Sequence, residues 1–88
     1  MSWDYKFTER ALKQLKRLDR SSQQRVLNWL DERIVGCENP AQWGKELKGE
    51  LHGLRKYRIG DFRIICQLQG DQLIVLVVRA GHRKNIYD

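Results

Sequence analysis

The apolar residues of this chain change their spacing near its middle, and that change limits the folds open to it. Leucine, valine and isoleucine recur every three or four residues from Leu12 to Leu18 and again from Val26 to Ile34, with polar and charged residues between them. After Gly53, apolar and polar residues alternate in short runs separated by Gly-Asp pairs. The first spacing places apolar side chains on one face of a helix, and the second places them on one face of a sheet. The chain therefore predicts helices packed against a sheet.

The N-terminal part predicts a short strand followed by a helix. Trp3 to Phe7 alternates aromatic with charged residues, which is typical of a half-buried strand. Thr8 offers an N-cap hydroxyl, and Glu9 stands in the first turn, where the helix dipole favours an acid. The apolar stripe continues to Leu18, so we expect the helix to run to about that residue.

A second helix is predicted after a short break at Asp19-Arg20. Ser21 followed by Gln24 is a capping-box pattern, so we expect Ser21 to begin the helix. Gly36 ends it, and Asn39-Pro40 prevents its continuation. Because the break is short, the two helices should form an antiparallel hairpin.

Three strands are predicted in the second half of the chain, over residues 54–59, 62–69 and 73–80. Gly60-Asp61 and Gly70-Asp71 are two-residue turns of the kind that joins antiparallel strands. The last of the three strands is the most apolar and should lie centrally in the sheet.

These elements define the expected architecture. Segment 41–53 is irregular, and we expect a connecting loop there. The prediction is a single α+β domain over residues 1–88, with the order β-α-α-β-β-β. A two-helix hairpin should pack on one face of a mostly antiparallel four-stranded sheet.

Composition excludes several classes of protein. The charge is 17 − 11 = +6 with histidine neutral, which favours a polyanionic or acidic partner. No apolar run approaches the ~20 residues of a membrane-spanning helix, and no charged-then-apolar leader opens the chain, so we expect a cytoplasmic protein away from membranes. Cys37 and Cys66 are too few for a disulfide framework, and no Cys/His cluster has zinc-site spacing. We expect neither a metal nor another cofactor.

Basic residues gather on the predicted sheet and on the segment after it. Arg63 alternates with Phe62 and Ile64, so it should point away from the helices. The turn at Gly60-Asp61 would bring it near Arg58. An ordinary polar outer face is one explanation, but like charges this close repel each other unless an anion offsets them. The other cations of this set are Arg55, Lys56, Arg79, Arg83 and Lys84.

Segment 81–87 adds groups that suit proton transfer and phosphate binding. His82 titrates near neutral pH, Arg83 has a planar fork that fits phosphate, and Tyr87 offers a ring and a phenol. A lone histidine such as His82 is more often a surface residue than a catalyst. Cations with one or two polar groups suit phosphodiester cleavage in which the 2′-hydroxyl of RNA is the nucleophile. That reaction needs no metal.

Two motifs resemble the RelE/ParE toxin superfamily. They are YRIGDFRI at residues 57–64 and GHRKNIY at residues 81–87. The resemblance covers nearly the whole chain in order and points to the RelE branch more than to the ParE branch. It implies a toxin of a type II toxin–antitoxin system that enters the ribosomal A site and cuts mRNA there. The products would be a 2′,3′-cyclic phosphate and a 5′-hydroxyl.

The resemblance also implies roles for particular residues. Arg63 and Arg83 correspond to arginines that stabilise the phosphate, and Tyr87 to a tyrosine that stacks on a base and takes part in proton transfer. Lys56 matches one lysine of the basic strand, but the lysine proposed as general base falls on Leu54 here. The base is therefore open between Lys56 and His82. The remaining cations are expected to bind RNA: Arg55, Arg58, Arg79 and Lys84.

Two other functions stay open. One is a ParE-like inhibitor of DNA gyrase that cuts no RNA, although that branch tends to lack the complete set of Arg63, Arg83 and Tyr87. The other is a small nucleic-acid-binding module without catalysis. For a toxin, the resemblance implies a RelB-like antitoxin whose acidic segment wraps the basic surface and folds on binding, in a hetero-oligomer. The 30S A site and mRNA would be the other partners.

Overall fold

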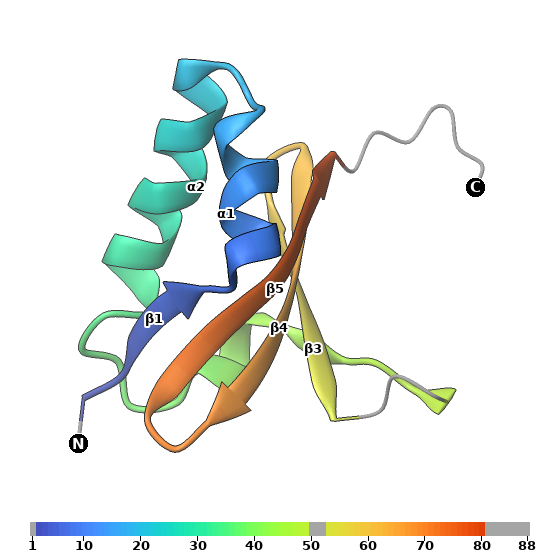
Figure 1. Cartoon of the computed structure of the whole chain (residues 1–88). Helices are drawn as coiled ribbons and strands as arrows, with labels where there is room; N and C mark the ends of the chain where they lie inside the picture. Colours follow the sequence, from blue (N-terminus) through green and yellow to red (C-terminus); the bar gives the residue numbers. More distant parts are fainter. Residues whose placement is uncertain (1, 50–52, 81–88) are drawn as a thin grey trace.

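The computed structural model describes residues 2–49 and 53–80, which form one sheet with two helices on one face (Figure 1). The helices are α1 (Glu9–Lys16) and α2 (Arg20–Arg33), and a 3-10 helix, η1 (Pro40–Trp43), follows them. The strands are β1 (Asp4–Phe7), β2 (Lys45–Glu46), β3 (Leu54–Ile59), β4 (Phe62–Gln69) and β5 (Gln72–Ala80). The predicted α+β class is confirmed.

The strands lie in the order β1-β5-β4-β3-β2. β1 pairs with β5 in parallel, and every other neighbouring pair is antiparallel. β5 is paired on both sides, as its apolar sequence predicted. In Figure 1 the chain rises through α1 and returns through α2, which confirms the helical hairpin. Among the residues that the structure describes, no helix covers the opposite face of the sheet.

The sheet has five strands, so the prediction of four was wrong. The additional strand is β2, which lies inside segment 41–53, where a loop was expected. Lys45 pairs with Lys56, and Glu46 pairs with Arg55. β2 has only two residues, and both are exposed, so its sequence carries no apolar alternation that could have revealed it.

The helix boundaries also differ from the prediction. α1 ends at Lys16, two residues before Leu18, whose side chain packs against the core from the turn. α2 begins at Arg20, because Asp19 is its N-cap: the Asp19 carboxylate accepts hydrogen bonds from the Ser22 backbone N–H at 3.2 Å and from its hydroxyl at 2.7 Å. The expected capping box that begins at Ser21 is therefore wrong.

The second helix ends slightly earlier than Gly36. α2 closes at Arg33 with Ile34 as its C-cap, and Gly36 follows with φ +81°. The Gly36 N–H donates to the Trp3 carbonyl at 2.9 Å, which ties the end of α2 to the start of β1. Neither α1 nor α2 is long and apolar enough to span a membrane.

One hydrophobic core lies between the helices and the sheet. Leu15 of α1 and Leu30 of α2 face inward, against Ile64 and Cys66 of β4 and Val75 of β5. The β4 residues that alternate with these inward-facing ones lie on the uncovered face of the sheet, as the alternation predicted. The remaining buried apolar residues are Ala11, Val26, Ile34, Tyr57, Ile59, Leu73 and Val78.

A bulge in β5 changes which of its residues face the helices. Ile65 of β4 pairs with Val77, whereas the next residue, Cys66, pairs with Val75, so Leu76 has no partner on β4. Before the bulge Val75 is buried on the helix side, and after it Val78 is buried there instead. The extra residue reverses the alternation, and Arg79 therefore lies on the uncovered face.

Candidate RNA-binding and catalytic surface

Three arginines form a single row across the uncovered face of the sheet. Arg58 of β3 pairs with Arg63 of β4, and Arg63 pairs with Arg79 of β5. Residues directly opposite on neighbouring strands have Cβ atoms about 4.5–5.5 Å apart. Arg63 therefore lies between two other guanidinium groups, and we call these three residues the arginine row.

The arginine row is unfavourable without an anion. Like charges directly opposite each other on a sheet destabilise it. Asp61 is the one acid in the hairpin sequence 54–69, and it lies in the exposed turn between β3 and β4. A phosphate would accept hydrogen bonds from several guanidinium forks and offset their repulsion. The row is thus suited to bind a phosphodiester.

A second row of cations lies beside the arginine row. Lys56 is two residues before Arg58 on β3 and so shares its face, about 6.6 Å further along the strand. Lys45 of β2 pairs with Lys56 across the edge of the sheet. A cavity of about 270 Å³ opens here, lined by Trp43, Lys45, Lys56 and Arg58. The cationic surface thus extends from Arg79 on β5 to Lys45 at the sheet edge.

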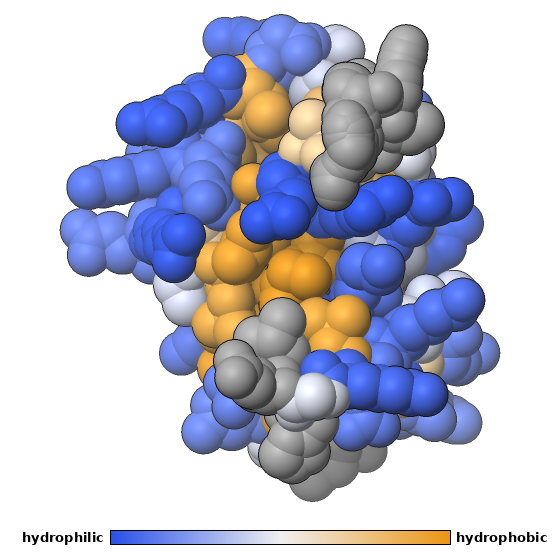
Figure 2. Space-filling model, turned by 90° about the vertical axis from the view of Figure 1, so that its right-hand side faces the viewer, coloured by the Kyte–Doolittle hydropathy of each residue, from blue (hydrophilic) through white to orange (hydrophobic). Residues whose placement is uncertain are grey.

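Apolar side chains run between these cations on the same face. Figure 2 shows the uncovered side of the sheet, where a hydrophobic strip is bordered by hydrophilic side chains. In the register of the sheet, Lys56 is followed across the strands by Ile65 and Val77, and Gln67 is followed by Ile74. This face therefore combines cations with apolar contact area.

Arg55 does not belong to this surface, although the sequence placed it among the RNA-binding cations. It lies on the face of β3 that carries Tyr57, and it is only partly exposed. Its Nη2 atom donates to the carbonyl oxygens of Ala41 and Gly44, both at 3.3 Å. The Arg55 guanidinium therefore holds the segment after α2, and this correction follows from the alternation of β3.

Four of the predicted site residues lie outside the described residues: His82, Arg83, Lys84 and Tyr87. The structure describes β5 up to Ala80, which pairs with Phe62 next to the arginine row. Among the predicted site residues that the structure describes, four lie together on the uncovered face of the sheet: Arg58, Arg63, Arg79 and Lys56.

Trp43 and Lys45 also line this surface, and the sequence did not reveal them. Both lie in segment 41–53, for which the sequence predicts a loop, and neither apolar spacing nor a motif distinguishes them there. Their position beside Lys56 depends on the pairing of β2 with β3. The only signal was indirect, since a loop of about a dozen residues is longer than usual and is often functional.

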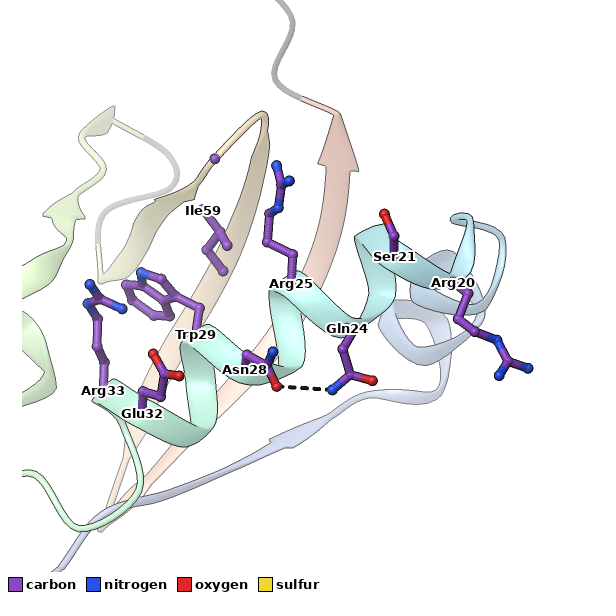
Figure 3. Close-up of a pocket in the computed structure, with 10 residues that line it drawn as sticks. Arg20, Ser21, Gln24, Arg25, Asn28, Trp29, Glu32, Arg33 and Ile59 are labelled. Carbon is purple, nitrogen blue, oxygen red and sulfur yellow. Dashed lines mark hydrogen bonds between the residues drawn. The ribbon is translucent and has the colours of Figure 1, made fainter.

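A different groove follows α2 on the helix side of the β3–β4 turn (Figure 3). Arg25 reaches over Gly60, and a Cβ built on that glycine would lie 3.1 Å from Arg25 Nη1. The Arg33 guanidinium carbon lies 5.4 Å from the ring centroid of Trp29. This groove opens on the opposite side of the sheet from the arginine row, so the two are separate.

The described residues offer no obvious thiol nucleophile or metal site. Burial raises the pKa of the Cys66 thiol and, less strongly, that of Cys37, so both thiols stay protonated near neutral pH. Within residues 2–49 and 53–80, no three His, Cys, Asp or Glu side chains come together as metal ligands would. The chemistry that this surface can supply is charge stabilisation by guanidinium and ammonium groups.

A small α+β domain with a cationic sheet face is the class of protein that these observations define, and comparison with known proteins agrees with it. Residues 5–87 match the family described as the ParE toxin of the type II toxin–antitoxin system parDE. The chain is 34% identical over 85 residues to an Escherichia coli protein described as a RelE-like toxin, covering 96% of this chain and 86% of that protein.

Solved structures share the fold. The toxin–antitoxin complex RelBE2 of Mycobacterium tuberculosis contains a chain that superposes with a TM-score of 0.81 at 22% identity, covering 91% of this chain and 99% of that one. The isolated RelE toxin of E. coli superposes with a TM-score of 0.70 at 21% identity, covering 94% and 88%. The chain belongs to the RelE/ParE superfamily and is a toxin of a type II toxin–antitoxin system.

Proposed function

We propose that this toxin is a ribosome-dependent endoribonuclease that cuts mRNA in the A site and so stops translation. The arginine row is the observation that carries this proposal. Cleavage by the 2′-hydroxyl of RNA passes through a phosphorane with an additional negative charge, and fixed cations stabilise that charge more than the ground state. Arg63, at the centre of the row, has a guanidinium neighbour on each side.

The reaction needs an acceptor and a donor of protons as well as cations. The 2′-oxygen attacks phosphorus and loses its proton to a base, the P–O5′ bond breaks, and the 5′-oxygen takes up a proton. The products are a 2′,3′-cyclic phosphate and a 5′-hydroxyl, with no water consumed. We assign charge stabilisation to Arg63 and Arg83, base stacking and proton transfer to Tyr87, and the base to Lys56 or His82.

The remaining cations of the surface would hold the RNA without taking part in bond making. Arg58 and Arg79 flank Arg63, so they would contact the phosphate or its neighbours. Lys84 would add a further contact from the C-terminal segment. Arg55 is not included, because its side chain binds the carbonyls of Ala41 and Gly44.

Mapping of mRNA ends in a translation extract tests this function. Added toxin should produce new 3′ ends within codons that occupy the A site, and the cuts should disappear when ribosomes are omitted. An extract in which mRNA stays intact while ribosomes and toxin are both present would contradict the proposal.

Inhibition of DNA gyrase is the second candidate, because the matching family is described as a ParE toxin. A gyrase inhibitor would block supercoiling of plasmid DNA by purified gyrase and would leave mRNA uncut. The two assays on the same preparation separate the candidates.

A cognate antitoxin is the expected protein partner under either candidate. Several proteins that share this fold were solved as toxin–antitoxin complexes. The uncovered sheet face combines cations with an apolar strip, so we expect the antitoxin segment that covers it to carry acidic and apolar side chains. Such a segment would compete with RNA for the same surface.

A further inference from the structure

Trp43 is an exposed indole that the proposed reaction does not use. It is the last residue of η1 and is 37% exposed. Its ring stands edge-on to Trp29, with centroids 6.5 Å apart, and Trp29 in turn stands edge-on to Tyr57 at 5.6 Å. The indole is therefore held against Trp29, and about a third of the residue is open to solvent.

The short turn that carries Trp43 is held rigidly by β3. The buried Tyr57 hydroxyl donates to the Pro40 carbonyl at 2.8 Å. Arg55 donates to the carbonyls on either side of Trp43, those of Ala41 and Gly44. Gly44 lies so close to the Tyr57 ring that an added Cβ would be 2.8 Å from it. An aromatic side chain on such a turn loses little freedom when it binds a ligand.

The cavity beside this indole is strongly cationic. Within residues 2–49 and 53–80, it is lined by Trp43, Lys45, Lys56 and Arg58, with no acid among these residues. Lys45 and Lys56 are directly opposite each other in the register of β2 and β3, where like charges repel. Arg58 belongs both to this cavity and to the arginine row, so the cavity continues the surface on which the scissile phosphate is proposed to lie.

We propose that Trp43 is the stacking platform of a nucleotide subsite: a base of single-stranded RNA stacks on its indole while Lys45 and Arg58 hold the adjoining phosphates. An aromatic ring next to a cationic groove is the arrangement that binds single strands irrespective of sequence. A protein segment is a poorer occupant, because the described lining residues offer no apolar side chain besides the indole. The inference rests on the proposed RNA cleavage, since it gives the substrate a second point of attachment.

Binding of short RNAs to the full chain tests the subsite without ribosomes or cleavage. The probe is a fluorescent hexamer of 2′-O-methyl uridine, which cannot be cut, and the matched probe is an abasic hexamer with the same number of phosphates. Trp43→Ala should weaken binding of the uridine hexamer about 5- to 100-fold. Trp43→Phe keeps a ring and should stay within about threefold of the wild type. Neither variant should alter binding of the abasic hexamer.

Leu12→Ala is the control variant, because Leu12 on α1 is similarly exposed, at 39%, and lies away from the cavity. Its RNA binding should be unchanged, and thermal melts should show that every variant is folded. Equal affinity of wild type and Trp43→Ala for the uridine hexamer would overturn the inference. So would an equal loss on both hexamers, or a loss of antitoxin binding alone, which would make Trp43 a protein contact.

The two proposals fail in different ways. If the chain does not cut mRNA in a translation extract, the cleavage proposal fails while the hexamer measurement still reports on Trp43. If cleavage is confirmed and the hexamers show no dependence on Trp43, only the subsite is lost.

Discussion

Arg63 lies in a position where a cation is hard to explain by folding alone. It is half-buried between Arg58 and Arg79 on a sheet face, and the nearest acid in the hairpin sequence, Asp61, lies in the turn. Replacement by an uncharged residue should therefore relieve repulsion in the free protein. A residue that lowers the folding stability of the free protein and stabilises the negative charge of a bound ligand is expected at a functional site.

Arg63→Ala should lower the rate of mRNA cleavage about 100- to 1,000-fold, because it removes one donor to the charge that develops in the transition state. Its thermal stability should be equal to or above that of the wild type. The measurement is single-turnover cleavage on programmed ribosomes, with Arg10→Ala on the exposed face of α1 as the control. A rate within about twofold of the wild type would remove Arg63 from the site.

Tyr57 links stability to pH through the turn that carries Trp43. Burial raises the pKa of Tyr57 to about 12, from about 10 in the unfolded chain. Because the neutral phenol is favoured in the fold, this contribution is complete below pH 10 and is lost as the pH rises toward 12.

The free energy of unfolding should therefore fall by about 2 kcal/mol more in the wild type than in Tyr57→Phe between pH 9 and pH 12. Urea titrations at several pH values measure the free energy of unfolding of both proteins, and contributions that the two proteins share cancel in the difference. Parallel declines in the two proteins would contradict the buried, neutral phenol.

At the scale of elements, the helix start at Asp19 shows where local sequence is ambiguous. Asp19 and Ser21 are both good N-caps, and Ser21 also has Gln24 three residues later. The structure selects Asp19, whose carboxylate accepts two hydrogen bonds from Ser22. Which of the two residues caps α2 depends on the path of the turn that follows α1, and no local sequence pattern specifies that path.

Asp19→Ala should lower Tm by about 5 °C, because the first turn of α2 loses its cap. Ser21→Ala should change Tm by no more than about 1 °C, since its side chain does not cap the helix. Thermal melts of the two variants make the comparison. A larger effect at Ser21 than at Asp19 would show that the helix begins where the sequence pattern placed it.

The strand boundaries were predictable where the apolar alternation and a turn sequence indicated the same residues. β3 and β4 have the predicted bounds, because apolar alternation meets the Gly60-Asp61 turn between them. That alternation also placed Arg63 on the uncovered face beside Arg58. Two features were not predictable, because each depends on how neighbouring strands pair: the bulge at Leu76 and the edge strand β2. The inward position of Arg55 follows from the alternation of β3, in which Arg55 shares the face of Tyr57.

The bulge has the largest effect on the candidate site. With regular pairing, Arg79 would share the inward face of Leu73 and Val75, and the arginine row would have two members. The sequence identified Arg79 as a member of the cationic set, but its place in the row follows only from the register. Trp43 and Lys45 escaped detection for the same reason, because β2 brings them to the site.

For the whole molecule, the net charge of +6 is less informative than its distribution. Residues 1–35 carry eight cations and five acids, and residues 36–88 carry nine cations and six acids, so each part has a net charge of +3. Only in the second part does the sheet gather cations into rows on one bare face. The same face would serve RNA and antitoxin in turn.

RNA binding by the free toxin should be strongly salt-dependent. Five cations of the surface from β2 to β5, if each contacts a phosphate, predict a slope of log K against log salt of about −3.5. They are Lys45, Lys56, Arg58, Arg63 and Arg79. The toxin–antitoxin complex should show a much shallower slope if, as proposed, the antitoxin segment covers these cations. Filter-binding titrations at several salt concentrations measure both, and equal slopes would show that the two surfaces do not overlap.

The central claim is that the toxin cuts RNA by using the 2′-hydroxyl of its substrate. The most direct measurement is cleavage of two mRNAs on programmed ribosomes, one unmodified and one with a single 2′-deoxy nucleotide at the scissile position. The unmodified mRNA should be cut to a 2′,3′-cyclic phosphate and a 5′-hydroxyl, and the deoxy mRNA should be bound but left intact. Equal cutting of both mRNAs would contradict the mechanism, and cutting of neither would contradict the assignment as a nuclease.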